Sequence, residues 1–160
     1  MAAILKPDLN ATIKLDFEGG ITENGIDSVP KRNGLYVAFV CDKLLTKEGC
    51  YTCKRIAYIG KAEGTNDLHK RIQEHFDNDH ELWAEKCRLS PYETFVYVYA
   101  IFEDTRLADV ESALIYRNQP IVNIQHRDRY NGNSWILWIN CEGNIGILNP
   151  QVVVARYIGE

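Results

Sequence analysis

The sequence has no apolar run long enough to cross a bilayer. Its longest uncharged apolar run, TFVYVYAIF at 94–102, is far shorter than the roughly 20 residues of a membrane-spanning helix. The first residues lack the apolar stretch and small-residue cleavage site of a secretory signal. There is also no internal repeat and no low-complexity segment. We therefore expect an intracellular, cytoplasmic protein with no membrane partner and, at 160 residues, one domain with a sizeable core.

An excess of basic residues is also absent. The chain has 18 Lys and Arg against 22 Asp and Glu, which gives a formal net charge of -4. This argues against a protein that coats nucleic acid nonspecifically, because such proteins are usually basic. A local basic cleft remains compatible with the composition, since phosphate contacts depend on where the charges lie.

The cysteines lack the pattern of a complete zinc site. There are five of them, and an odd number cannot all pair within one chain, so we expect reduced thiols. Cys50 and Cys53 have the C-x-x-C spacing of half a tetrahedral zinc site, and Cys41 is near them. Cys87 and Cys141 are isolated, so a second close pair is missing. A loop with incidental thiols is the favoured interpretation, and zinc is the alternative.

Several short runs have the pattern of strands. Residues 35–40 and 55–60 are rich in β-branched and aromatic residues and predict a hairpin, joined by a polar connection at 41–54. Residues 94–102 are apolar at both odd and even positions, which indicates a central strand covered on both faces. The alternation of apolar residues at 13–17 predicts an edge strand.

Two segments have the pattern of helices. Asp67 is a suitable N-cap for the first, in which Arg71 and His75 are four residues apart and so share a face. A second helix is expected within 105–118, before a proline. Glu111 lies on the apolar stripe of this helix, where a carboxylate has a desolvation cost unless it has a partner or a function.

The last part of the chain predicts further strands. Residues 134–140 and 144–148 are interpreted as a hairpin, and 152–158 as one more strand. We expect these residues to form an accessory sheet.

An ordered set of residues between 29 and 124 resembles the GIY-YIG nuclease family. The set consists of GLY at 34–36, YIG at 58–60, Arg71, Glu111 and Asn123. The resemblance implies an α/β (α+β) fold, with a three-stranded antiparallel sheet flanked by helices. We accordingly predict one domain, 1–160. It has a nuclease-like core at 29–124, an N-terminal extension at 1–28 and an extra C-terminal β-hairpin and strand extension at 133–160.

The resemblance also implies an activity. It predicts a small stand-alone endonuclease, a hydrolase of phosphodiester bonds in nucleic acid, with DNA favoured over RNA. The implied cofactor is Mg²⁺ or another divalent cation such as Mn²⁺. Glu111 would be the metal ligand, because magnesium takes one or two carboxylates and keeps several waters. Arg71 would hold the scissile phosphate through its planar fork of donors. For Arg71, pairing with Asp67 or Glu74 at the surface is the alternative.

The remaining predicted site residues supply proton transfer and substrate contacts. The resemblance points to Tyr36 and Tyr58, with Tyr36 the favoured one for proton transfer, although a phenol needs nearby cations to lower its pKa. His75 is the competing general base because it titrates near neutral pH. Lys61 would add positive potential for the substrate. Asn123 is expected beside it as a residue whose hydrogen bonds hold the set together.

Two other functions remain open. One is a catalytically weak or inactive module of the same fold that binds nucleic acid or protein, which the acidic composition favours. The other is a zinc-stabilised interaction protein that uses the cysteine-bearing connection.

Overall fold

The computed structural model describes residues 10–45, 51–134 and 136–156, with more residues in strands than in helices. The strands are β1 (Asn10–Ile21), β2 (Gly34–Leu45), β3 (Tyr51–Ala62), β4 (Glu93–Ile101), β5 (Ile136–Gly143) and β6 (Gln151–Ala155). The helices are the 3-10 helix η2 (Glu23–Ser28) and the α-helices α1 (Leu68–Asn78), α2 (His80–Lys86) and α3 (Leu107–Asn118).

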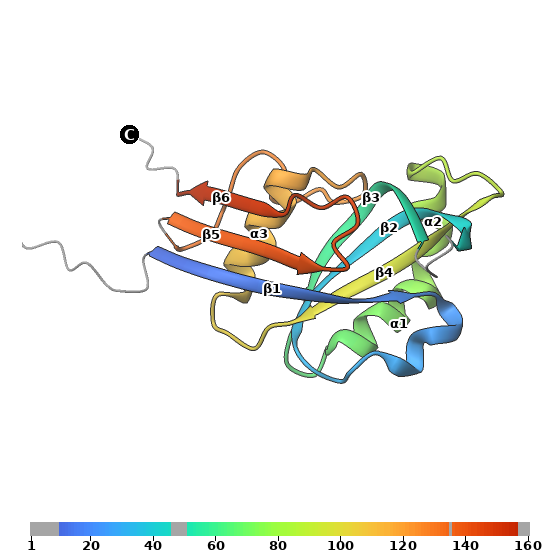
Figure 1. Cartoon of the computed structure of the whole chain (residues 1–160), viewed down its shortest axis with the longest axis horizontal. Coiled ribbons are helices and arrows are strands. Elements are labelled where there is room, and N and C mark those ends of the chain that lie inside the picture. Colours follow the sequence, from blue (N-terminus) through green and yellow to red (C-terminus); the bar gives the residue numbers. More distant parts are fainter. Residues whose placement is uncertain (1–9, 46–50, 135, 157–160) are drawn as a thin grey trace, which may run out of the picture.

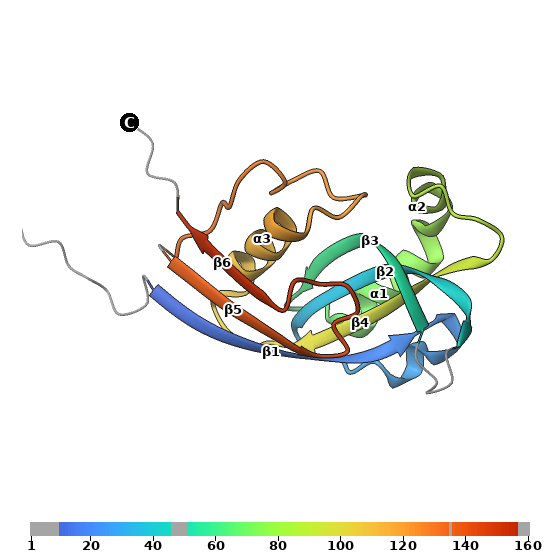
Figure 2. The same cartoon turned by 45° about the horizontal axis from the view of Figure 1, so that its top comes forward.

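All six strands belong to one mixed sheet, in the order β3-β2-β4-β1-β5-β6. Neighbours are antiparallel except β1 and β5, which are parallel. The sheet curls into a half-barrel, and α3 lies across its open side, where it packs against both edge strands, β3 and β6 (Figures 1 and 2). The helices α1 and α2 pack on the opposite face. The sheet therefore separates two apolar clusters, one around α3 and one around α1.

Strand β1 joins the two halves of this sheet. Its first part pairs with β5 and its last part, from Glu18 to Ile21, pairs with β4. Within this last part Gly19 and Gly20 have φ values of 117° and 108°, and the register with β4 shifts between Gly19 and Ile21. A Cβ atom on Gly19 would lie 3.0 Å from the carbonyl oxygen of Tyr97. Glycine is therefore needed where the strand passes from one partner to the other.

The predicted three-stranded sheet flanked by helices is wrong. The strands expected at 35–40, 55–60 and 94–102 lie within β2, β3 and β4, but the sheet continues beyond them. The strand expected at an edge, 13–17, lies inside the sheet and brings β5 and β6 into it. The C-terminal strands are therefore part of the same sheet, not an accessory one. Alternation showed that one face of 13–17 is buried, but it carries no information about which strands form hydrogen bonds on either side.

Other boundaries also differ from the prediction. Residues 144–148 form turns, with Gly143 and Gly146 at φ values of 80° and 54°, so β5 pairs with β6. The connection expected at 41–54 is largely strand, because β2 extends to Leu45 and β3 begins at Tyr51. Residue Cys50, half of the C-x-x-C pair, lies outside the described residues. In the part of the chain that the structure describes, no helix has the length and apolar character to cross a membrane.

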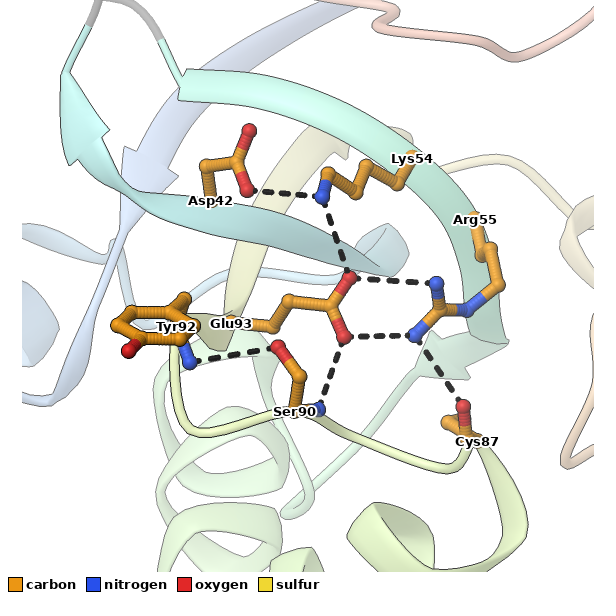
Figure 3. A network of polar contacts seen from close by, with 7 residues as sticks. All are labelled: Asp42, Lys54, Arg55, Cys87, Ser90, Tyr92 and Glu93. Carbon is orange, nitrogen blue, oxygen red and sulfur yellow. Dashed lines mark hydrogen bonds and ion pairs between the residues drawn. The ribbon is translucent and has the colours of Figure 1, made fainter.

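A polar network ties the start of β4 to β3 (Figure 3). The Glu93 side chain is only 6% exposed, and both its oxygens accept hydrogen bonds from Arg55, at 3.0 and 3.2 Å. The backbone amide of Ser90 donates to it at 2.9 Å, and Lys54 Nζ lies 3.6 Å away. These contacts lower the pKa of Glu93 to about 2, chiefly through the hydrogen bonds from Arg55. Glu93 is thus a carboxylate that is strongly stabilised in its charged form.

Candidate active site

Two tyrosines lie side by side on neighbouring strands. Tyr36 on β2 is fully buried and Tyr58 on β3 is half-buried, and their ring centroids are 6.0 Å apart. Gly60 is the ladder partner of Tyr36. A Cβ atom at Gly60 would collide with the Tyr36 hydroxyl and come within 2.8 Å of the Tyr58 ring. The glycine of the YIG run therefore makes room for both tyrosine rings.

Helix α1 places a histidine against this pair. Asp67 caps the helix, as expected, by accepting a hydrogen bond from the Lys70 amide at 2.9 Å. The buried His75 has its Nε2 atom 2.7 Å from the Tyr36 hydroxyl and its Nδ1 atom 2.7 Å from Asp79 Oδ2. Tyr36, His75 and Asp79 thus form a continuous chain of hydrogen bonds.

The direction of these hydrogen bonds follows from the charge of His75. Burial lowers the pKa of His75, and this outweighs the opposing effect of its hydrogen bond to Asp79. The imidazole is therefore neutral at pH 7 and has one N–H. Because the Asp79 carboxylate can only accept, Nδ1 carries the hydrogen and donates to it. The Nε2 atom then accepts from the Tyr36 hydroxyl.

Asp79 and Trp83 were not predicted from the sequence. Asp79 is the C-cap of α1, four residues after His75, a spacing that brings the two side chains together on a helix. Trp83 on α2 is buried and its ring centroid lies 4.8 Å from that of Tyr58 and 4.5 Å from that of His75. The His-x-x-x-Asp spacing could have revealed Asp79, whereas no sequence signal pointed to Trp83.

Arg71 contacts both the tyrosine pair and a carboxylate. Its Nη2 atom lies 3.5 Å from the Tyr36 hydroxyl and its Nη1 atom 3.1 Å from Glu74 Oε2. Arg71 thus pairs with Glu74, as the alternative interpretation expected, and it contacts Tyr36 at the same time. The positive charge of Arg71 lowers the pKa of Tyr36, but burial, the larger effect, raises it well above its ordinary value. Burial likewise raises the pKa of Tyr58. Both phenols are thus protonated at neutral pH.

A cavity of about 320 Å³ opens beside these residues. It is lined by Tyr58, Lys61, Glu63, Asn66, Arg71, Glu111 and Gln125, and we refer to it as the site cavity. Four of the predicted site residues therefore face one space. Tyr36 and His75 do not line it, and they reach it through their contacts with Arg71 and Tyr58.

Glu111 enters the site cavity from α3. Burial raises its pKa, while the charge of Lys61 and a backbone hydrogen bond from that residue oppose the rise. In residues 10–45, 51–134 and 136–156 it has no ion-pair partner within 4.0 Å, and no group of three or more His, Cys, Asp or Glu side chains is placed to hold a metal. One partly desolvated carboxylate beside the amide and carboxylate oxygens of the lining suits a cation that keeps most of its water, as Mg²⁺ does. The donor set therefore fits a hydrated divalent cation.

The two predicted substrate-binding residues lie in different settings. Lys61 lines the site cavity, but its Nζ atom pairs with Glu63 Oε1 at 2.8 Å. Asn123 is buried and does not line this cavity. Its side chain accepts from the Ile59 amide and donates to the Ile59 carbonyl, both at 2.9 Å, so it holds the following loop against β3. This agrees with the expected hydrogen-bonding role of Asn123.

The loop after Asn123 is also anchored at its far end. Buried Asp109 on α3 accepts hydrogen bonds from the amides of Asn133 and Ser134, each at 2.9 Å, and from the Ser134 hydroxyl at 2.7 Å. Between the two anchors, Gln125 lines the site cavity and Arg127 is hydrogen-bonded to Gln119. The loop therefore has a fixed position at the mouth of the site.

Comparisons of the chain with protein-family models, with curated proteins and with solved structures found no significant match.

Proposed function

We propose that the protein is a metal-dependent endonuclease of the GIY-YIG type, which hydrolyses phosphodiester bonds in nucleic acid, with DNA as the favoured substrate. The observation that carries the proposal is the hydrogen-bonded chain Tyr36–His75–Asp79, which contacts Arg71, a residue that lines the site cavity together with Glu111. A phosphate-binding cation and a carboxylate around one open space, with a proton acceptor behind them, are the groups that phosphodiester hydrolysis requires.

The proton of the attacking water reaches this chain of hydrogen bonds through Tyr58, which packs beside Tyr36 with ring centroids 6.0 Å apart. The proton enters the tyrosine pair at Tyr58, which lines the site cavity, and Tyr36 delivers a proton to His75 Nε2. Asp79 then stabilises the imidazolium that forms. Since both phenols are protonated in the resting protein, they act by passing a proton on, and His75 is the final acceptor. A carboxylate that orients a histidine in this way also fixes its tautomer.

Arg71 and Glu111 supply the electrostatic part of the reaction. The Arg71 guanidinium donates to two oxygens of the scissile phosphate and stabilises the charge that develops on them. Glu111 would hold the divalent cation, with Gln125 and Asn66 as neighbouring oxygen donors. When bound, such a cation polarises a phosphoryl oxygen and stabilises the leaving oxygen.

The decisive experiment is a cleavage assay with a matched inactive variant. End-labelled single- and double-stranded DNA and RNA are incubated with the full chain in Mg²⁺, in Mn²⁺ or in a chelator. The variant Glu111→Gln, purified in parallel, controls for contaminating nucleases. We expect cleavage by the wild type with metal only, and none by the variant. Equal cleavage by the two proteins, or none by either, would refute the proposal.

A binding module of the same type is the second candidate. The observation in its favour is twofold. Burial raises the pKa of both tyrosines, so neither is ionised to act as a base, and Lys61 is paired with Glu63, which cancels part of the positive charge that a phosphate would meet. In that case nucleic acid binds to the wild type and to Glu111→Gln alike, without cleavage. Measurement of affinity alongside cleavage therefore separates the two functions.

A further inference from the structure

Two cysteines face each other on the face of the sheet opposite to Tyr36. Cys41 on β2 and Cys53 on β3 are partners in the antiparallel ladder, and their sulfur atoms are 3.4 Å apart. Cys41 belongs to the apolar cluster around α3, whereas Tyr36 belongs to the cluster on the opposite face. The pair is thus separate from the candidate active site, although it lies on the same two strands.

The two thiols differ in access. Cys41 is fully buried, but Cys53 is half-buried and lines a cavity of about 200 Å³ together with Tyr51, Val96 and Gly146. A Cβ atom on Gly146 would lie 2.9 Å from the Cys53 sulfur, so the glycine leaves the space beside that sulfur open. A small oxidant can therefore reach Cys53 and not Cys41.

The thiols also differ in reactivity. The Cys41 thiol donates a hydrogen bond to the Cys53 sulfur, which lowers the pKa of Cys53 and raises that of Cys41. The thiolate is the nucleophilic form of cysteine, so Cys53 is the one that reacts first.

We propose that Cys41 and Cys53 are an oxidisable dithiol that forms a reversible disulfide between β2 and β3. Ladder partners in an antiparallel pair have Cα atoms about 4.5–5.5 Å apart, which lies within the usual range for a disulfide. The register shifts on both sides of Cys41, so the pair is not held rigidly by regular ladder hydrogen bonds before and after it. Closing the sulfur atoms to bonding distance then needs a movement of only about 1.4 Å.

With hydrogen peroxide as oxidant, the reaction has two steps. The Cys53 thiolate attacks one peroxide oxygen, the O–O bond breaks and hydroxide leaves, which gives a sulfenic acid on Cys53. The Cys41 sulfur then attacks the Cys53 sulfur, the S–O bond breaks, and the departing oxygen leaves as water with the Cys41 proton. The hydroxide from the first step takes up the proton that Cys53 lost when it ionised. Two thiols are oxidised, one peroxide is reduced, and the products are a disulfide and two waters.

Peptide mapping of the oxidised full chain tests this proposal. The protein is treated with hydrogen peroxide, its remaining thiols are alkylated, and it is digested with trypsin without reduction. Cleavage after lysine and arginine gives peptide 33–43, which contains Cys41, and peptide 48–54, which contains Cys50 and Cys53. We expect these peptides to be linked within a monomer, with two thiols lost per chain, and a dithiol reductant to restore both. Tandem mass spectra distinguish Cys53 from Cys50 as the linked residue, so the link can be mapped in the wild-type protein.

Variants make the test specific. Cys50→Ser should form the same link, and Cys87→Ser, which removes a remote buried thiol, should form it too. Cys53→Ser and Cys41→Ser should each prevent it, with circular dichroism to verify that they fold. A link made only through Cys50, a link only between two chains, or no link at all would overturn the proposal. So would stoichiometric zinc in the purified protein that is lost in Cys53→Ser, because the thiols would then be metal ligands.

Discussion

Removal of the negative charge of Glu93 should destabilise the fold by a predictable amount. The pKa of Glu93 falls from an ordinary value of 4.5 to about 2. At about 1.4 kcal/mol for each pKa unit, this corresponds to about 3 kcal/mol at pH 7. Its partners Arg55 and Lys54 have side chains 35% and 43% exposed, so solvent screening reduces the effect. For Glu93→Gln we expect a loss of about 2 kcal/mol, a shift of roughly 1 M in the urea midpoint.

The same contact predicts how this loss depends on pH. Because the pKa of Glu93 is lowered by folding, its contribution is complete above about pH 4.5 and disappears as the pH falls through about 2. The stabilities of wild type and Glu93→Gln should therefore converge between these values.

Urea unfolding at pH 7, 4 and 2.5, followed by circular dichroism, measures both effects. The matched control is Glu85→Gln, an exposed glutamate on α2, which should change stability by less than about 0.5 kcal/mol. The reasoning would be refuted by a Glu93→Gln variant as stable as the wild type at pH 7, or by a difference that stays constant down to pH 2.5.

Three further predictions concern the candidate active site. Arg71→Lys keeps the charge but loses the planar two-pronged contact with phosphate. Single-turnover cleavage should therefore slow by about a hundred- to a thousandfold, with little change in affinity for nucleic acid at fixed salt. An unchanged rate would show that Arg71 is an ordinary surface residue. Asp79→Asn should slow cleavage about a hundredfold or more. Since Asp79 raises the pKa of His75, its loss should also move the acid limb of the pH–rate profile to lower pH, and a limb that stays in place would exclude the proton path. Gly60→Ala should displace the tyrosine rings and lower both activity and thermal stability. Gly25→Ala, where the nearest atom to the added Cβ lies 3.8 Å away, is the comparison for crowding; equal stability of the two variants would contradict the role given to Gly60.

The parts of the structure that local sequence determines could be predicted. The Asp67 cap, the shared face of Arg71 and His75, and the buried strand within 94–102 all depend on neighbours along the chain. Local sequence does not show that Arg71 and Glu111 line one cavity, since the two residues are 40 positions apart.

The remainder depends on contacts between distant segments. The parallel pairing of β1 with β5 and the turn at 144–148 follow from the tertiary arrangement, and the predicted fold was wrong for that reason. The apolar residues that indicate this helix, Leu68, Ile72 and Phe76, end before Asp79, so Asp79 was missed. Several carboxylates lie near Lys61. Sequence spacing alone does not show that it pairs with Glu63.

The central place of β1 has a consequence for how the chain folds during synthesis. Asn10 pairs with Ile136 and Phe17 with Gly143, so β1 leaves the ribosome long before β5, the strand with which it pairs. Pairings this distant in sequence are slow to form, because the chain loses the entropy of closing a long loop before the stabilising contacts are made. Until β5 arrives, one edge of β1 can pair with β5 of another chain and exchange strands with it. Synthesis at low temperature and low chain concentration should therefore improve the yield of monomer.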